Sequence, residues 1–352
     1  MIDDTTTLEI LVAREHEAEQ EVARALQARD DPINDLLDAF DSYRRISQAC
    51  SFAIPAYVEQ FEARLWQAHT EGKKYFSGAL RKMRKQPERA IETRQLIKFY
   101  LRFIKDSQRF YRGYILALNE TYGGIAELQA IAHQVQGADA AESESSQQVY
   151  TAAERAKALL SCHLALIYLG DLSRYRASEQ LDRTPDFGPA IGYYSLACAL
   201  RPASGMGHHQ QAVIALEQKA HLRAIYHLYR AIVVEDPHPV AANNLMLEFG
   251  KVNAAWDKGE LVQKGQPNDP EGPKHALIGW FIRLHSMCFK GEPYRGHSEL
   301  EREVLGQLGA AVRQVTPDHT LMRMVIINLA SQFNAGELYQ GKHVILTHND
   351  HS

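Results

Sequence analysis

A repeat with a period of 34 residues constrains the fold of this chain more than any other feature of its sequence. Ala190 and Ala197 recur 34 residues later as Ala224 and Ala231, with tyrosines and leucines between them, and a proline follows each unit. This pattern is typical of tetratricopeptide-like hairpins, which have small residues where two helices touch, larger residues between the helices and a proline at the end of each unit. Two such units are too few for a free-standing solenoid, so we expect them to continue a stack of helices that begins earlier in the chain.

Apolar residues at three- and four-residue spacing predict helices along the rest of the chain, and no run with the two-residue period of a strand occurs. The expected helices cover about 1–30, 33–52, 55–86, 89–119, a short stretch ending near 133, 151–177, 240–256, 275–290, 297–316 and 319–335. Polar loops are expected at 134–148 and 264–273, and the tail 341–352 loses the helical period. The sequence therefore predicts an all-α protein.

The composition of the chain limits the functions that it can have. The chain has 352 residues, of which 45% are hydrophobic, enough for a large core or two domains. A net charge of −4 argues against a basic field over the whole protein. The four cysteines lie far apart without a CxxC pair, which favours reduced thiols. No signal peptide or membrane-spanning run is recognisable, so we expect no membrane partner and a location in the cytoplasm, the nucleus or both.

Motifs that carry catalysis are missing from the sequence. It contains no Walker loop, GxGxxG, HExxH or GxSxG pattern. The neighbouring His208 and His209 would point about 100° apart on a helix, so they are not expected to chelate one metal ion. We therefore expect a binding protein with no catalytic residues, no cofactor and no metal site.

Positive charge is concentrated in one segment. Residues 73–112 carry thirteen lysines and arginines against three acidic residues. Lys74 and Arg81 are seven residues apart, which places them on one face of a helix. Most of these side chains are expected to be solvated, and Arg84 is expected on the solvent face. A subset that faces inward would form an anion site.

The helix predicted over 151–177 ends in a second cationic motif. Gly170 has no side chain, which indicates that another helix approaches closely there. Arg174, Tyr175 and Arg176 then place two guanidinium groups beside a phenol, a combination that can bind a phosphate. The residues alone leave open that Arg174 pairs with Asp171, three residues before it, and that Arg176 is solvated.

The stretch Leu169-Gly-Asp-Leu-Ser-Arg-Tyr-Arg176 resembles a motif of the family formed by the ever-shorter-telomeres proteins of telomerase and the nonsense-mediated mRNA decay adaptors. The similarity is strongest over 164–250 and fair over 95–118 and 275–330, and Arg109-Phe-Tyr-Arg-Gly-Tyr114 is similar to fungal members in particular. The resemblance implies a 14-3-3-like helical superhelix with tetratricopeptide-like repeats over 1–250. It also implies that 251–352 is the start of an α-helical hairpin region, which we expect to be truncated.

The resemblance further implies a phosphoserine or phosphothreonine site in the first domain. The arginine of the family motif falls on Arg174, with Tyr175 beside it. The family lysine follows a Leu-Trp pair, found here at Leu65-Trp66, but ungapped alignment places Glu71 at its position. The candidate phosphopeptide-binding residues are Arg174, Tyr175, Lys74, Lys73, Arg81 and Arg112.

We interpret the chain as a non-catalytic adaptor in nonsense-mediated mRNA decay. The expected partner is a phosphorylated, disordered segment of a decay factor such as the family's helicase partner, and a heterodimer with a related adaptor is a further expectation. Two alternatives stay open. In the first, the chain is a telomerase-associated subunit whose basic segment 73–112 contacts nucleic acid. In the second, it is a plain protein–protein scaffold with an inactive pocket, as the acidic Glu71 would favour.

Overall fold

The computed structural model describes residues 4–28, 33–136, 150–182, 184–262, 272–290, 295–313 and 319–349. Over these residues it is built from α-helices and short 3-10 turns, and it contains no strand, which confirms the predicted all-α fold. The loops predicted at 134–148 and 264–273 fall for the most part outside the described residues.

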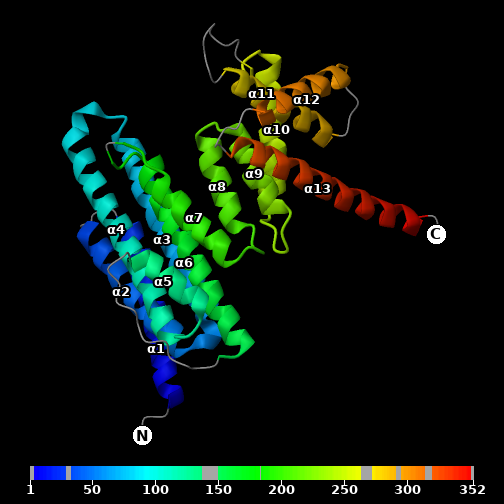
Figure 1. Ribbon diagram of the computed structural model, residues 1–352. Helices are drawn as coiled ribbons and strands as arrows, with labels where there is room; N and C mark the ends of the chain where they lie inside the picture. Colours follow the sequence, from blue (N-terminus) through cyan, green and yellow to red (C-terminus); the bar gives the residue numbers. More distant parts are fainter. Residues whose placement is uncertain are drawn as a thin grey trace. The chain divides into compact units, whose positions relative to one another are not determined.

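The chain divides into two compact units, residues 1–200 and 201–352. The predicted division at residue 250 concerns the domains of the family and stays a prediction. The helices of the first unit are α1 (Asp4–Gln27), α2 (Ile33–Ala53), α3 (Val58–Met83), α4 (Ala90–Thr121), α5 (Ala126–Gln136), α6 (Ala152–Ser178) and α7 (Gly188–Leu200) (Figure 1). Those of the second are α8 (Met206–Glu217), α9 (His221–Ile232), α10 (Ala241–Asp257), α11 (Gly272–Lys290), α12 (His297–Arg313) and α13 (Thr320–Asn349).

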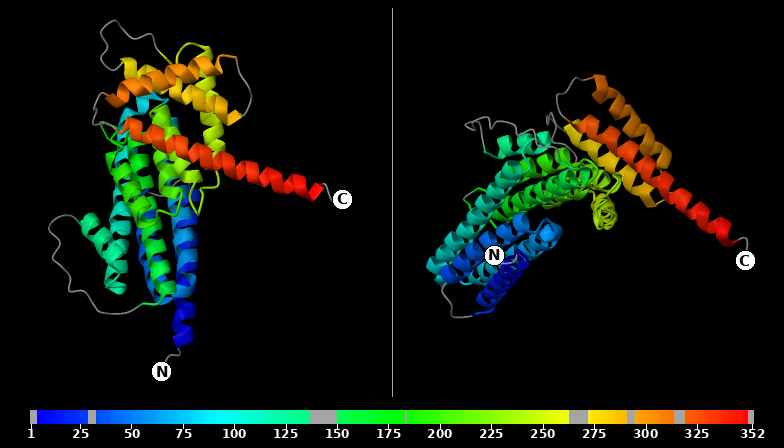
Figure 2. Two further views of the ribbon diagram at one scale, coloured as in Figure 1. Left: turned by 45° about the vertical axis from the view of Figure 1, so that its right-hand side comes forward. Right: turned by 90° about the horizontal axis from the view of Figure 1, so that it is seen from below.

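Sequence signals set the helix boundaries in the first unit. Short 3-10 turns at Pro55–Tyr57 and Pro87–Arg89 precede α3 and α4, because proline fits the first turn of a helix, where its missing N–H costs nothing. A capping box starts α6, in which the Thr151 side chain accepts from the Glu154 N–H and the Glu154 carboxylate accepts from the Thr151 N–H. The long α3 and α4 run side by side, and α6 packs against α4 and α7 (Figures 1 and 2).

The contact between α6 and α7 explains Gly170. A methyl group at this position would lie 2.5 Å from Cδ1 of the Tyr194 ring and closer still to Cε1. Tyr194 is fully buried, so its ring cannot move aside. The predicted close approach at Gly170 is therefore confirmed, and α7 is the helix that makes it.

The alanines of the 34-residue repeat are structural. Ala190, Ala197, Ala224 and Ala231 are all fully buried. In the second unit, the segments before α8 and before α10 pair through a single parallel bridge, in which the Gly205 N–H donates to Asp236 O and the Asp236 N–H donates to Ala203 O, both at 2.9 Å.

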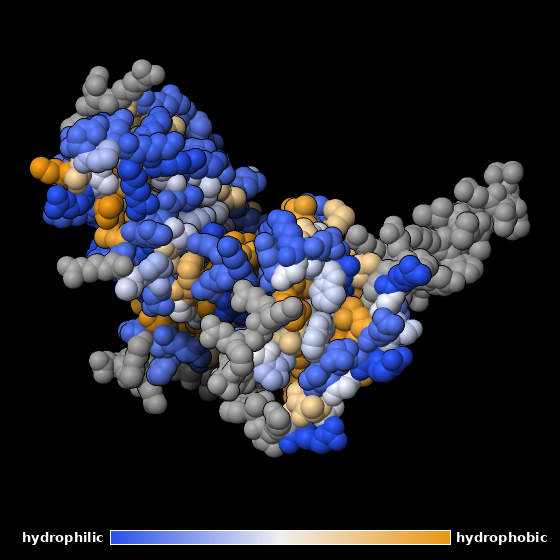
Figure 3. All heavy atoms as spheres, turned by 90° about the horizontal axis from the view of Figure 1, so that it is seen from above, coloured by the Kyte–Doolittle hydropathy of each residue, from blue (hydrophilic) through white to orange (hydrophobic). Residues whose placement is uncertain are grey.

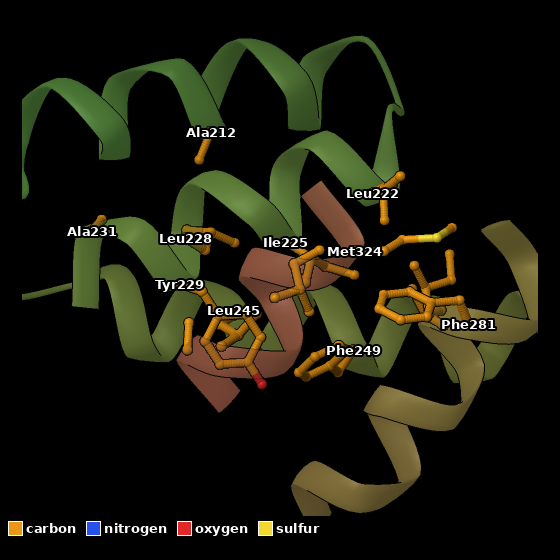
Figure 4. Packing of buried hydrophobic residues seen from close by; sticks show 14 of the residues in the cluster. Ala212, Leu222, Ile225, Leu228, Tyr229, Ala231, Leu245, Phe249, Phe281 and Met324 are labelled. Atoms are coloured by element: carbon orange, nitrogen blue, oxygen red, sulfur yellow. The ribbon is translucent and has the colours of Figure 1, made fainter. Parts of the chain in front are cut away.

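One core serves the helices of the second unit. Side chains of α9, α10, α11 and α13 point toward one another, with Ile225, Leu245, Phe281 and Met324 among the residues that are at most 3% exposed (Figure 4). In Figure 3, hydrophilic side chains cover much of the visible face, and hydrophobic ones form smaller patches between them. No helix within the described residues is long and apolar enough to cross a membrane.

The end of the chain corrects one expectation. We predicted that the last helix ends near residue 335 and that 341–352 is not helical, but α13 continues to Asn349. The apolar period that defines a half-buried helix stops earlier, and in Figures 1 and 2 the C-terminal part of α13 extends past the helices on which its first turns pack. Apolar periodicity marks a helix only where one face is buried, so its loss after residue 335 does not mark the end of the helix.

The close contact at Gly170 predicts the effect of a single methyl group. Gly170→Ala is expected to destabilise the protein by about 1–3 kcal/mol because the new methyl group overpacks a filled core. Gly192→Ala on α7 is the matched control, since nothing lies within 4 Å of the added methyl group. The free energy of unfolding of Gly192→Ala should rise by about 0.5–1 kcal/mol, because alanine is preferred over glycine inside a helix. Urea unfolding followed by circular dichroism measures both, and equal midpoints for the two variants would contradict the packing described here.

Candidate functional site

The C-terminal end of α6 and one face of α3 form the candidate site. Ser77 Oγ donates to the Glu179 carboxylate at 2.7 Å, and Lys73 Nζ lies 3.5 Å from the same oxygen. Arg84, at the end of α3, donates to Glu179 O at 2.7 Å. Positions 73, 77 and 84 fall within a narrow arc of α3, so one face of this helix makes all three contacts.

Two cations meet at the ring of Tyr175. Lys73 Nζ lies 5.2 Å and Arg174 Cζ lies 4.9 Å from the ring centroid. These distances are typical of cation–π contacts, which hold a cation beside an aromatic face without neutralising its charge. The structure thus brings three of the predicted site residues together from α3 and α6.

The guanidinium of Arg174 is held in a hydrogen-bonded triad. Its Nη2 donates to Asp171 Oδ1 at 2.8 Å, and its Nε donates to the Tyr194 hydroxyl at 3.2 Å. That hydroxyl in turn donates to Asp171 Oδ1 at 2.6 Å. The alternative in which Arg174 pairs with Asp171 is therefore what the structure shows, yet the Arg174 side chain remains 15% exposed and keeps a route to solvent. The triad fixes the direction of Arg174 and does not remove it from the surface.

Burial and neighbouring charges set the ionisation of the site. Burial, aided by the Asp171 carboxylate, raises the pKa of Tyr175 to about 12, so this phenol is protonated at neutral pH and can donate to an anion. Burial alone would lower the pKa of Arg174, but Asp171, Tyr194 and Tyr175 together outweigh burial and hold that pKa above its usual value. Each cation of the site faces one carboxylate, Asp171 for Arg174 and Glu179 for Lys73.

The remaining candidates lie away from this cluster. Lys74 and Arg81 are exposed on α3, rotated from Lys73 by about 100° and about 80° around the helix. Arg112 is half-buried on α4 and forms no ion pair within the described part of the chain. The binding roles of all six candidates remain predictions.

The sequence did not indicate which residues the arginines near the site would pair with. Arg84, expected on the solvent face, is exposed but donates to the main-chain carbonyls of Glu179 and Gln180, just past the end of α6. Arg176, expected to be solvated, pairs with Asp182, one of its bonds measuring 3.0 Å. Tyr194 and Glu179 carried no signal of their own, because the first reaches Arg174 from a different helix and the second lies beyond the end of α6.

The triad generates a direct test. Tyr194→Phe keeps the ring against Gly170 and removes the hydroxyl that bonds both Asp171 and Arg174. We expect a loss of about 1–3 kcal/mol in the free energy of unfolding, because the buried carboxylate loses a donor. Tyr193→Phe, on the same helix and half-buried, is the control and should be neutral. Chemical denaturation compares the two, and equal stability would show that the triad contributes nothing.

Comparisons with known proteins extend over both units. Residues 60–180 match the family model described as telomerase activating protein Est1, and residues 190–344 match the model described as the Est1 DNA/RNA binding domain. The nonsense-mediated mRNA decay factor SMG7 of Arabidopsis thaliana is 31% identical over 210 residues, which are 56% of this chain and 19% of that protein. The telomere elongation protein est1 of Schizosaccharomyces pombe is 25% identical over 169 residues, 46% of this chain and 34% of that protein.

A solved structure shares the fold. The crystal structure of Est1 and Cdc13 superposes with a TM-score of 0.67 at 14% identity, covering 91% of this chain and 64% of that one. This likeness confirms the predicted 14-3-3-like helical fold with tetratricopeptide-like repeats. The chain spans between 10% and 34% of the length of these curated relatives. Together, the two matched models and these relatives show that the chain belongs to the family of the telomerase activating protein Est1 and the nonsense-mediated mRNA decay factor SMG7.

Proposed function

We propose that this chain is a non-catalytic adaptor that binds a phosphoserine or phosphothreonine peptide at the cluster of Lys73, Arg174 and Tyr175. The observation that carries the proposal is the convergence of two cations from different helices on one phenol ring. A phosphate with a charge of about −1.5 to −2 and three acceptor oxygens matches such a cluster. Charge-assisted hydrogen bonds from both cations and from the phenol would replace its hydration.

The two carboxylates of the site have different roles in this proposal. Asp171 is almost completely buried and accepts a hydrogen bond from Tyr194. It therefore remains paired with Arg174 and fixes the orientation of the guanidinium. Glu179 caps the end of α6, is 20% exposed, and lies closer to the surface. An incoming phosphate would displace Glu179 from Lys73 and leave Asp171 in place.

The names of the relatives support two pathways, mRNA decay and telomere maintenance. One is named a nonsense-mediated mRNA decay factor and others are named telomerase-binding or telomere elongation proteins. We place this chain in mRNA decay, with a phosphorylated, disordered segment of a decay factor as its ligand and a related adaptor as a second protein partner. The solved Est1 occurs with another protein, Cdc13, which supports a role in protein assembly.

The alternative of a telomerase-associated subunit is favoured by the matched DNA/RNA binding model and by the exposed Lys74 and Arg81 in segment 73–112. The salt dependence of binding separates the two functions. A protein that contacts several phosphates of a nucleic-acid strand releases several counterions, whereas binding of a single phosphopeptide releases few. A plain scaffold would bind phosphorylated and unphosphorylated peptides alike. Glu71, which favoured the scaffold, is exposed and accepts a hydrogen bond from Gln67.

Matched phosphorylated and unphosphorylated peptides, titrated into residues 1–352 by calorimetry, test the proposal. Lys73→Gln and Arg174→Gln should each weaken binding of the phosphorylated peptide by about tenfold or more, the value of one charge-assisted bond. Glutamine is preferable to glutamate at 174, since a carboxylate there would face the buried Asp171. Arg176→Gln, at the same helix end but paired with Asp182, is the control. Unchanged affinity in both Lys73→Gln and Arg174→Gln would refute the site.

Glu179 offers a test in the opposite direction. Glu179→Gln keeps an oxygen that can accept from Ser77 but removes the negative charge that competes for Lys73. We expect tighter binding of the phosphorylated peptide by severalfold and no change for the unphosphorylated one. A fall in affinity would mean that Glu179 orders the site and does not compete with the ligand.

A further inference from the structure

The cluster proposed to bind phosphate lies on a longer seam between α3 and α6. Three pairs of side chains meet across this seam, and the members of each pair are 102 residues apart in the sequence: Trp66 with Tyr168, Lys73 with Tyr175, and Ser77 with Glu179. A difference that stays constant from pair to pair requires two helices that run in the same direction with the same rise per residue. The α3/α6 seam is therefore regular along these two helices.

α4 packs against both helices of the seam and runs in the opposite direction. The centroid of the Tyr111 ring lies 6.0 Å from that of Trp66 and 5.3 Å from that of Tyr168. Later in α4, the Tyr114 hydroxyl donates at 2.7 Å to Oε1 of Glu62, which precedes Trp66 by about one turn of α3. The contacts among the three helices thus continue past the stacked rings, toward the N-terminal ends of α3 and α6.

A pocket lies at that end of the seam, within the first unit. Val58 of α3, Leu118 of α4 and Ala158 of α6 line it, and Phe52 from the end of α2 adds an aromatic wall. The open space among the lining residues measures about 300 Å³, its mouth included. This volume is at the lower limit of ligand pockets, so the pocket suits a single large side chain better than a whole cofactor.

The polar groups of the pocket already bond to one another. The Tyr114 hydroxyl donates to the buried Glu62 carboxylate, and the hydroxyls of Ser51 and Ser161 hydrogen-bond to the same phenol. Because these groups are engaged, an occupant gains mainly by burying apolar surface. Lys157 also lines the pocket, is exposed, and can place its ammonium group over an aromatic ring. The chemistry of the pocket therefore favours an aromatic side chain.

The rise of the two helices gives the distance from the pocket to the phosphate cluster. Val58 precedes Lys73 by fifteen residues, about 22 Å along α3, and Ala158 precedes Tyr175 by seventeen residues, about 25 Å along α6. An extended peptide covers about 3.3 Å per residue, so about seven residues span this distance. Trp66 is half-buried midway between the two points and offers apolar surface to the residues that cross it.

We propose that this pocket binds an aromatic side chain of the same phosphorylated peptide, about seven residues from the phosphorylated one. The inference rests on the proposed function and adds to it the class of sequence that the chain selects. Lys73, Arg174 and Tyr175 hold the phosphate at one end of the seam, and the pocket holds the aromatic ring at the other. Two contacts joined by a short segment act as a bivalent ligand, because each raises the effective concentration of the other.

Calorimetric titration of residues 1–352 with two series of phosphoserine peptides tests the proposal. One phenylalanine stands five to nine residues before the phosphoserine in the first series and after it in the second, in a background of glycine and serine. Matched peptides carry alanine in its place. At a spacing of about seven residues, phenylalanine should bind about tenfold more tightly than alanine in one series, since ordering the peptide offsets part of the gain from burial. Equal affinities at every spacing in both series would overturn the proposal.

Two tyrosines provide a matched pair of variants. The rings of Tyr122 and Tyr150 contact each other, with centroids 5.5 Å apart, but Tyr122 lines the pocket and Tyr150 does not. Tyr122→Ala should bind the phenylalanine and alanine peptides equally, whereas Tyr150→Ala should keep the preference for phenylalanine. Circular dichroism shows whether both variants are folded. A preference that survives in folded Tyr122→Ala would place the aromatic residue elsewhere and refute the pocket.

The Lys73→Gln variant separates this inference from the proposed function. It should weaken the phosphorylated phenylalanine and alanine peptides by the same factor, because it acts at the other end of the seam. If Lys73→Gln weakens binding but phenylalanine gives no advantage, the phosphate site stands and the pocket is wrong. If phosphorylation makes no difference to the affinity of any peptide, the proposed function fails and this inference fails with it.

Discussion

The contact between the backbone of Gly170 and the ring of Tyr194 is the constraint on which the candidate site depends. With no side chain on α6 at this point, the ring of α7 lies directly against the helix backbone. This closeness places the phenol where it reaches both Asp171 and Arg174, one and four residues further along α6. A residue that suits helix packing thus sets the direction of the candidate arginine, so a change in the packing at Gly170 also changes the candidate site.

The phosphate site proposed in the first unit has a convergent geometry. In the first unit, cations from two helices converge on one ring, and each faces a carboxylate. Such a site selects a ligand that carries more charge at one point than a carboxylate does. A convergent site of this kind discriminates between ligands by their local charge density.

Much of the fold follows from the sequence, but only part of the site does. Apolar periodicity locates the helices because each one buries a single face, and the repeat alanines are fully buried. Arg174 and Tyr175 lie in a recognisable motif, and Gly170 signals a close approach. Lys73 and Lys74 illustrate the limit, because neighbours on a helix point about 100° apart and only the packing of α3 decides which one faces α6. The sequence favoured Lys74, whereas Lys73 contacts the ring. Glu179 lies past the end of its helix, where no period applies.

The bridge between the turns before α8 and α10 determines which positions there can vary. Its hydrogen bonds join main-chain atoms of residues 203, 205 and 236, so most side chains at the half-buried 203 and the exposed 236 can change without breaking it. Ser204 is buried and admits only small side chains. Residue 205 is the exception, because a methyl group there would overlap Ala231 O and lie 2.8 Å from His238 N, neither of which can yield. In a collection of natural variants, residue 205 should therefore be an invariant glycine, while residues 203 and 236 vary. That pattern would identify the bridge in distant relatives whose repeat alanines are no longer recognisable.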